Sequence, residues 1–314
     1  MTVPTPPPFG IYPPVVTFFN EDETVDYIAF SKHLERLLES GVAGLVIHGS
    51  NGEASHLLHE ERAEMIRAAR RIVDQRKKST VIIAGCSAPS VRETLLFIEE
   101  AKQAGADYAL VLPPSFWPAV MTKAVIKSFY VDVAAKSSLP IIIYNFPVVS
   151  GGLDLDSDLI TEIATSSPNI VGVKLSCGNV GKVARLSSSF DSTQFAPFGG
   201  KADFLLPGLI AGSHGAIAVL ANLTPKALSK VISLYDEGNV AEAKELQAKL
   251  SHADWTLSTL GVSGTKLATQ KFFGYGNPKT RAPFVTVGKH VIGVTALERL
   301  QAVIDVENGI KANL

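Results

Sequence analysis

The sequence contains only two cysteines, Cys86 and Cys177, among its 314 residues. They stand far apart in the chain, so the sequence offers neither a disulfide framework nor the Cys-x-x-Cys spacing of a zinc site. Chains without a disulfide framework are typical of reducing compartments. Residues 1–10, MTVPTPPPFG, also lack the basic and apolar regions of a secretory signal. We therefore expect a cytoplasmic protein, although a processed organellar form would look the same.

The chain also has no excess of positive charge and no long apolar run. The 29 lysines and arginines are balanced by 30 acidic residues, which gives a formal net charge of -1. A protein whose main task is to bind nucleic acid needs a basic surface to neutralise phosphates, so we expect no nucleic-acid partner. No uninterrupted apolar run reaches the ~18 residues of a membrane span, so we expect no membrane partner either. The expected ligand is a small molecule.

Signatures of metal and nucleotide sites are missing as well. His56 and His59 lie near Glu60, but not in the His-Glu-x-x-His order of zinc proteases. The glycine-rich residues 199–203, GGKAD, lack the full spacing of a phosphate-binding loop. We therefore predict no metal ion and no nucleotide or redox cofactor.

The chain does contain an alternation of short apolar runs with longer amphipathic stretches, which is typical of βα units. Runs such as VIIAG at 81–85 are apolar throughout, as parallel strands covered on both faces are. An open doubly wound sheet is the alternative, but no Gly-x-Gly-x-x-Gly follows the first strand. Eight units predict an α/β fold, a (β/α)8 TIM barrel over residues 10–238. The predicted strands are 14–18, 44–48, 81–85, 108–112, 141–145, 171–175, 195–198 and 216–220.

Residues 239–314 depart from this repeat and form a predicted C-terminal helical extension. Helical spacing of apolar residues runs through 240–260, 264–273 and 295–310. The extension could pack on the barrel or build a contact between subunits, and the sequence leaves both open.

Polar residues at the carboxyl ends of the predicted strands are the candidates for an active site, because barrels of this type place their sites there. Lys174 lies in an otherwise apolar strand, where desolvation favours a neutral, nucleophilic amine; the alternative is a lysine that reaches out to solvent. Tyr144 could transfer a proton beside such an amine, or only pack its ring at the rim. The segment GSNGE at 49–53 could gather backbone N–H groups and the Ser50 hydroxyl around a carboxylate, or form an ordinary polar turn.

Four motifs in this order resemble the dihydrodipicolinate synthase and N-acetylneuraminate lyase family of pyruvate-dependent aldolases. They are GSNGE at 49–53, YNFP at 144–147, VGVKLS at 171–176 and the glycine-bearing segment 198–222. The resemblance extends over nearly the whole chain. It implies a (β/α)8 barrel with C-terminal helices, commonly assembled as a tetramer, so we expect a homotetramer or a dimer.

The same resemblance implies roles for individual residues. Lys174 would form a Schiff base with the substrate, and Tyr144 would transfer protons. Ser50 and Asn51 would receive the substrate's carboxylate and the oxygen next to the reacting carbon. The residues expected to bind the substrate are Ser50, Asn51, Ser176, Gly200 and Ile217.

Two positions depart from the pattern of the family. The synthases carry an arginine that grips the acceptor's carboxylate two residues after the proline of YNxP, and here that residue is Val149. Loss of a bidentate clamp disfavours dihydrodipicolinate synthesis. Phe116, in PPSFWP, stands where a neighbouring subunit usually supplies a tyrosine to the proton relay. The relay must then run differently, through water or Ser115, or the activity is reduced.

The segment GSNGE and Ser176 look more like the 4-hydroxy-2-oxoglutarate aldolase branch than like the synthases, which usually carry GTTGE. The 2-oxo-3-deoxy sugar acid aldolases are equally compatible. We therefore predict a lyase that cleaves a 4-hydroxy-2-oxo acid to pyruvate and an aldehyde. The alternatives are a dihydrodipicolinate synthase and a pyruvate-binding homologue with weak catalysis.

Overall fold

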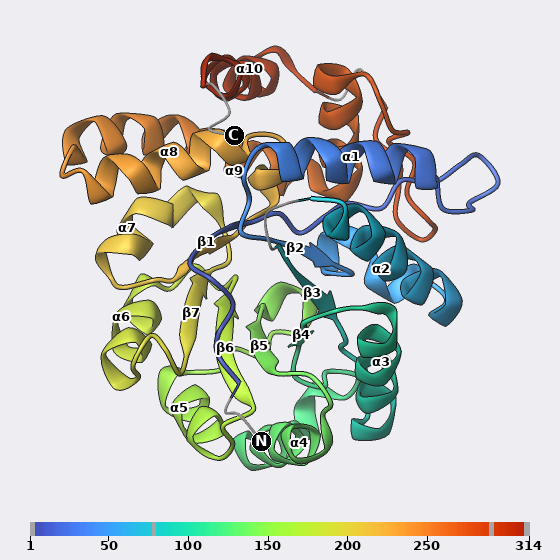
Figure 1. Cartoon of the computed structure of the whole chain (residues 1–314), viewed down its shortest axis with the longest axis vertical. Coiled ribbons are helices and arrows are strands. Elements are labelled where there is room, and N and C mark those ends of the chain that lie inside the picture. The colour runs from blue at the N-terminus through green and yellow to red at the C-terminus, as the bar shows by residue number, and fades with distance from the viewer. Residues whose placement is uncertain (1–3, 77–79, 289–291, 311–314) are drawn as a thin grey trace.

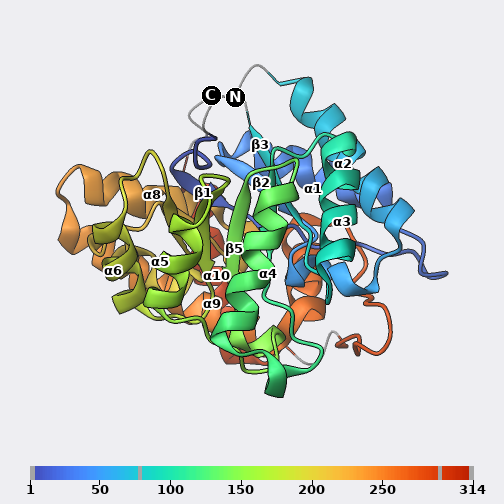
Figure 2. The same ribbon diagram turned by 90° about the horizontal axis from the view of Figure 1, so that it is seen from below.

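Parallel strands surround a common axis in the computed structural model, and helices cover them on the outside (Figure 1). The structure describes residues 4–76, 80–288 and 292–310, and within these ranges eight strands follow one another around a single sheet. Each strand is followed by a helix, and a second view shows several of these helices on the outside of the strands (Figure 2). The predicted (β/α)8 barrel is confirmed. The strands are β1 (Gly10–Tyr12), β2 (Gly44–Ile47), β3 (Val81–Gly85), β4 (Tyr108–Val111), β5 (Ile141–Asn145), β6 (Ile170–Leu175), β7 (Ala196–Gly199) and β8 (Gly215–Ile217).

Seven of the eight strands overlap the runs predicted from the sequence. The first prediction, residues 14–18, is wrong, because the strand is Gly10–Tyr12. Two prolines, residues 13–14, follow this strand, and proline has no N–H for a strand ladder, so regular pairing ends there. The apolar side chain of Phe18 packs instead against Tyr275, near the other end of the chain.

The barrel closes between β1 and β2 through a few backbone hydrogen bonds rather than a regular ladder. The Ala43 N–H donates to the Ile11 carbonyl at 3.0 Å. The Val46 N–H donates to the Pro13 carbonyl at 3.0 Å, and the Val46 carbonyl accepts from the Val15 N–H at 2.9 Å. These contacts leave the barrel nearly closed.

Side chains at the start of several helices accept hydrogen bonds from the first turn. At α3, Ser90 accepts from the Glu93 N–H at 3.2 Å. At α1, Asp26 accepts from the N–H groups of Ile28 and Ala29. Such caps satisfy backbone donors that have no partner inside the helix. The helices around the barrel are α1 (Tyr27–Glu39), α2 (His59–Asp74), α3 (Val91–Ala104), α4 (Lys123–Lys136), α5 (Ser157–Thr165), α6 (Val180–Ser189), α7 (Leu205–Ile210) and α8 (Pro225–Asp236).

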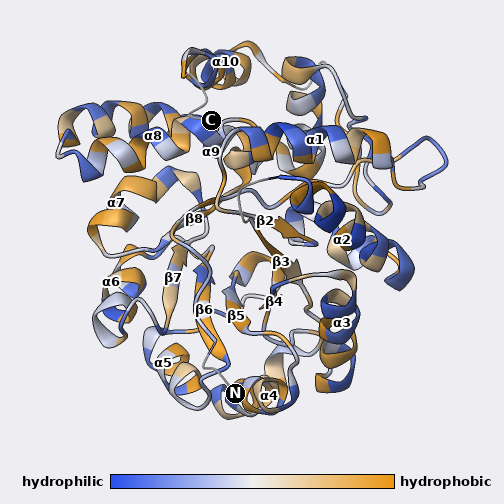
Figure 3. Ribbon diagram, viewed as in Figure 1, coloured by the Kyte–Doolittle hydropathy of each residue, from blue (hydrophilic) through white to orange (hydrophobic). Residues whose placement is uncertain are grey.

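Apolar side chains pack on both faces of the strands. Ile142 and Tyr144 of β5 belong to the cluster inside the barrel, whereas Ile141 and Ile143 belong to the cluster between strands and helices. The alternation follows from the two-residue period of a strand. Helices such as α2 and α3 accordingly combine apolar and strongly hydrophilic stretches (Figure 3).

The C-terminal helices pack on the barrel. Helix α9 (Val240–Phe273) lies against α8 and against two short 3-10 turns that follow β7 and β8, η5 (Ala202–Phe204) and η6 (Val219–Asn222). Gly261 interrupts α9 with φ 67° and ψ -164°, a conformation that glycine adopts readily, so the two predicted helical segments meet at a kink. Helix α10 (Val294–Gly309) packs on α8 and α9. A domain boundary at residue 238 stays a prediction.

Glu307 of α10 caps the N-terminus of α8. Its carboxylate accepts hydrogen bonds from the backbone N–H groups of Lys226 at 3.2 Å and Ala227 at 2.8 Å. Among the described residues, Thr224 provides no side-chain cap for this helix. The backbone donors in the first turn of α8 are therefore satisfied by a residue that lies 80 positions from Ala227 in the chain.

We expect Glu307→Ala to lower the free energy of unfolding by about 1–3 kcal/mol, because it leaves buried backbone donors without an acceptor. Urea denaturation would measure the loss. Glu298→Ala is the control, because Glu298 is exposed on the same helix. An equal effect of both substitutions would contradict the capping role of Glu307.

Candidate active site

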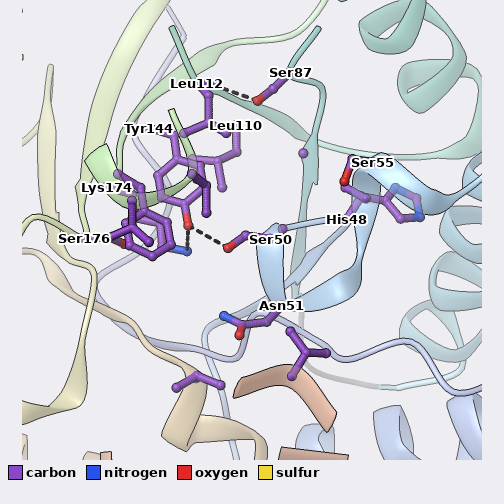
Figure 4. A pocket seen from close by; sticks show the side chains of 18 of the residues that line it. His48, Ser50, Asn51, Ser55, Ser87, Leu110, Leu112, Tyr144, Lys174 and Ser176 are labelled. Atoms are coloured by element: carbon purple, nitrogen blue, oxygen red, sulfur yellow. Dashed lines mark hydrogen bonds between the residues drawn. The ribbon is translucent and has the colours of Figure 1, made fainter. Parts of the chain in front are cut away.

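A cavity of about 1120 Å³ lies at the carboxyl ends of the strands (Figure 4). Its walls come from the strand ends, from the loops that follow them and from the middle of α9. All seven residues predicted from the sequence to form the site line this one cavity. They are Ser50, Asn51, Tyr144, Lys174, Ser176, Gly200 and Ile217.

Lys174 and Tyr144 lie side by side on adjacent strands. The pairing of β5 with β6 sets Tyr144 opposite Lys174, and only 1% of Lys174 and 2% of Tyr144 is exposed. The Lys174 Nζ donates to the Tyr144 hydroxyl at 3.3 Å and lies 4.3 Å from the centre of its ring. An amine held this close to a phenol can exchange protons with it.

Ser50 extends this contact into a chain of three polar groups. The hydroxyls of Ser50 and Tyr144 are 3.1 Å apart and share a hydrogen bond (Figure 4). Ser50 begins the 3-10 turn η1 (Ser50–Gly52), which two residues separate from the end of β2. Asn51 lies on the same turn and also lines the cavity. The turn thus presents polar side chains beside the amine of Lys174.

Ser176 and Gly200 form the neighbouring wall. The Ser176 hydroxyl donates to the Gly200 carbonyl at 3.3 Å. A Cβ at Gly200 would lie 2.3 Å from the Ser176 Oγ and 2.4 Å from its backbone nitrogen, so no larger residue fits without movement. Ile217 is fully buried at the end of β8 and provides an apolar surface.

The two departures from the family pattern lie on the rim of the same cavity. Phe116 is 88% exposed and Val149 is 40% exposed, and both line the cavity. Among the described residues, the Tyr144 hydroxyl contacts Ser50 and Lys174 but not Ser115. The structure therefore brings Ser115 to the cavity without joining it to the hydrogen-bonded chain.

His48 also lines the cavity, although no role was predicted for it from the sequence. It has a positive φ of 61° although it is not glycine, and it is buried. Burial, together with the nearby Arg62, holds the pKa of His48 well below its usual range, so its ring is neutral. Neither ring nitrogen has a hydrogen-bond partner in the described part of the chain, and the ring points away from Tyr144 (Figure 4). It is therefore outside the chain of polar groups at Lys174.

Sequence reasoning also missed the partner of Glu53, the last residue of GSNGE. Glu53 forms an ion pair with Lys266 of α9, and both side chains are fully buried. The two residues are 213 positions apart, and no local motif links them. Only the fold reveals this contact.

Residues 4–76, 80–288 and 292–310 contain no group of three or more His, Cys, Asp or Glu side chains that could hold a metal ion. In the same ranges, no helix is long and apolar enough to cross a membrane.

Comparison with known proteins finds relatives of similar length. The chain matches the model of the Dihydrodipicolinate synthetase family over residues 7–293. A Coccidioides immitis protein, provisionally named a mitochondrial 4-hydroxy-2-oxoglutarate aldolase, is 46% identical over 86% of this chain and 85% of its own length. A Hypocrea jecorina protein named L-threo-3-deoxy-hexylosonate aldolase is 41% identical over 86% of this chain and 88% of its own. A solved structure from Coccidioides immitis, provisionally described as a dihydrodipicolinate synthase family protein, covers 99% of this chain and 100% of its own at 40% identity and a TM-score of 0.88.

The expected cytoplasmic location is wrong by this comparison, because the Coccidioides relative is named as mitochondrial. The expectation rested on the two cysteines and on residues 1–10. The scarcity of cysteine excludes a disulfide framework, but it does not distinguish one reducing compartment from another.

We expect Gly200→Ala to lower the free energy of unfolding by about 1–3 kcal/mol, because the added methyl group overpacks the wall at Ser176. Urea denaturation is the measurement. Gly309→Ala is the matched control, since Gly309 is the last residue of α10 and nothing lies within 4 Å of a Cβ there. If Gly200→Ala were as well tolerated as the control, the close contact with Ser176 would be wrong.

Proposed function

The chain belongs to the Dihydrodipicolinate synthetase family, and from this premise we propose that it is a class I aldolase with Lys174 as its Schiff-base lysine. It cleaves a 4-hydroxy-2-oxo acid to pyruvate and an aldehyde. The observation that carries the proposal is the contact of the buried Lys174 amine with the Tyr144 hydroxyl at 3.3 Å. A nucleophile within hydrogen-bond reach of a proton-transfer group is the arrangement that imine chemistry requires.

The first step joins the substrate to the enzyme. The Lys174 amine, in its unprotonated form, attacks the C2 carbonyl carbon of the 2-oxo acid, and water leaves as the imine forms. The Tyr144 hydroxyl, within hydrogen-bond reach of the amine, gives its proton to the imine nitrogen and is left as a phenolate. The carboxylate of the substrate lies at the turn of Ser50 and Asn51, beside the Tyr144 hydroxyl.

Carbon–carbon cleavage follows, with the imine as the electron sink. Tyr144 removes the proton of the C4 hydroxyl, the C3–C4 bond breaks, and its electron pair moves to the imine to give an enamine. The C4 fragment leaves as an aldehyde. A proton then adds to C3, and hydrolysis of the imine releases pyruvate and the free Lys174 amine.

Position 149 favours cleavage over dihydrodipicolinate synthesis. Val149 lines the cavity with an apolar side chain, and an apolar group cannot grip an acceptor's carboxylate as a bidentate arginine does. The names of the two fungal relatives, a 4-hydroxy-2-oxoglutarate aldolase and a 3-deoxy-hexylosonate aldolase, support the same direction of chemistry. We take these two substrate types as the candidates.

We also propose that the chain assembles as a homotetramer or a dimer. Phe116 and Trp117 are 88% and 65% exposed, and Val148 is 84% exposed on a neighbouring loop. Gly151, on the loop of Val148, lies against Pro118, so the two loops are in contact. Exposed apolar groups that gather in this way are typical of protein contacts.

The proposed Schiff base predicts that borohydride with pyruvate will reduce an adduct onto Lys174, identified by peptide mass analysis. Lys174→Ala should give no adduct and no turnover. Lys182→Ala is the control, because Lys182 is also buried but its ammonium pairs with Asp154 away from the cavity lining. A wild-type protein that is folded and never trapped would rule out the mechanism.

The proton-transfer role predicts a different result for Tyr144→Phe. Its turnover of 4-hydroxy-2-oxoglutarate and of 2-oxo-3-deoxy sugar acids should fall by about 10²–10⁴-fold, the usual size of general acid–base catalysis. Tyr130→Phe is the control, since Tyr130 is buried and its hydroxyl bonds the Val111 carbonyl. Steady-state kinetics provide the comparison, and an equal loss in both variants would count against Tyr144 as the proton carrier.

A further inference from the structure

The buried ion pair of Glu53 and Lys266 has no part in the reaction described above, yet it adjoins the site. We propose that Glu53 and Lys266 are positioning residues that hold the turn of Ser50 and Asn51 in its substrate-binding conformation. The inference rests on the proposed function, in which this turn receives the substrate's carboxylate. It makes helix α9 a support of the catalytic machinery rather than only a cover of the barrel.

Glu53 is tied to the turn through its own backbone. It directly follows η1, and its N–H donates to the Ser50 carbonyl at 3.2 Å. One residue earlier, the Gly52 N–H donates to the Gly49 carbonyl at 2.9 Å. Glu53 has a φ of 54°, a left-handed conformation that is uncommon for residues other than glycine. Movement of its side chain is therefore transmitted directly to Ser50.

Lys266, on helix α9 in the C-terminal part of the chain, binds one oxygen of the Glu53 carboxylate. Its Nζ donates to Glu53 Oε1 and, at 2.7 Å, to the Lys279 carbonyl. It also lies 4.6 Å from the centre of the Phe19 ring. Both charged side chains are fully buried, so neither has water as a substitute for the other.

The second oxygen of Glu53 is held as well. Glu53 Oε2 accepts a hydrogen bond from the backbone N–H of Arg281 at 3.0 Å, and His56 Nδ1 lies 3.6 Å from the same oxygen. The Arg281 side chain in turn donates to the carboxylate of Glu61 and to the His56 carbonyl. One carboxylate thus joins three segments: the substrate turn, helix α9 and residues 279–281.

The third of these segments continues into the wall of the cavity. Thr280, Phe284 and Val285 line it, and the Phe284 ring meets the His56 ring edge-on at 4.4 Å. Glu53 therefore fixes two walls at once, the polar turn at Ser50 and the segment that faces it from the C-terminal part of the chain.

Stability alone does not account for this pair. Two charges withdrawn from water are often no better than an apolar pair of the same size, so a buried ion pair is weak evidence of a purely stabilising role. Burial lowers the pKa of Lys266 to about 8 even though the contact with Glu53 opposes this shift. The lysine thus keeps its charge at neutral pH with the help of the carboxylate. Strain and buried charge beside a site are typical of geometry that is maintained for function.

The test is pyruvate-dependent borohydride trapping of Lys174 in Glu53→Gln, which keeps the shape and removes the charge. The pyruvate concentration for half-maximal trapping should rise about tenfold or more, because misplacement of a binding group by about 1 Å can cost up to about 10²-fold. The fraction of Lys174 trapped at saturation should not change, since the nucleophile is intact.

The double variant Glu53→Gln/Lys266→Met separates positioning from stability, and it is also the variant to measure if Glu53→Gln fails to fold. Removing both charges should restore the melting temperature that is lost in Glu53→Gln, but it should not restore the affinity for pyruvate. Glu307→Gln is the matched control, because Glu307 is also a buried carboxylate in the C-terminal part of the chain but contacts the start of α8. This substitution should lower the melting temperature and leave the affinity for pyruvate unchanged.

Three outcomes would overturn the inference. Wild-type affinity for pyruvate in Glu53→Gln, or an affinity that recovers together with stability in the double variant, would reduce the pair to a structural contact. Absence of any adduct in the folded wild-type protein would instead refute the proposed function, and the inference with it.

Discussion

The register between β5 and β6 determines which side chains meet inside the barrel. Ile141 pairs with Ile170, but Ile142 pairs with Gly172, so β6 holds one extra residue at this point. From there on the register is shifted, and Tyr144 pairs with Lys174. Because side chains of a strand alternate between its faces, a slip of one residue would exchange inner and outer positions. The bulge is therefore what places the amine beside the phenol.

Gly172 makes this bulge sterically possible. A Cβ there would lie 2.6 Å from the Ala196 carbonyl oxygen of the next strand, so a larger residue would push β7 away. The residues around it are well packed: Val171 points into the barrel, and Val173 points toward the helices. The bulge in β6, three strands from the point where the barrel closes, thus positions Lys174 beside Tyr144. β-Bulges are common beside active sites because they redirect side chains in this way.

Much of this arrangement could be predicted from local patterns. Apolar runs located seven strands. Six of the seven predicted site residues stand at the carboxyl ends of predicted strands, the family resemblance added Ile217, and all seven are among the residues that line the cavity. Two features that the sequence did not predict involve partners in distant parts of the chain. The run at 14–18 is apolar because it packs against Tyr275, and Glu53 is buried because Lys266 reaches it from α9. Neither partner leaves a signal in the neighbouring sequence.

The contribution of α9 explains why the two halves of the chain form one site. The kink at Gly261 interrupts the helix beside the cavity, where Leu260 and Val262 are among the lining residues. The helix resumes and carries Lys266 to Glu53. A straight helix would run on past this point in one direction. The conformation of one glycine therefore links the direction of α9 to the position of the buried ammonium.

Because Phe116 stands where related proteins usually have a second tyrosine, proton transfer during cleavage must proceed without that hydroxyl. In a retro-aldol reaction the proton that leaves the C4 hydroxyl and the proton that later adds to C3 balance each other. A single group that accepts the first and returns the second completes this exchange, and Tyr144 lies 3.3 Å from the Lys174 amine, which carries the reacting carbons in the proposed mechanism. The Ser50 hydroxyl, 3.1 Å from Tyr144, can stabilise the phenolate by donating to it. In the proposed mechanism, cleavage to pyruvate thus needs no hydroxyl at position 116, where this chain has Phe116.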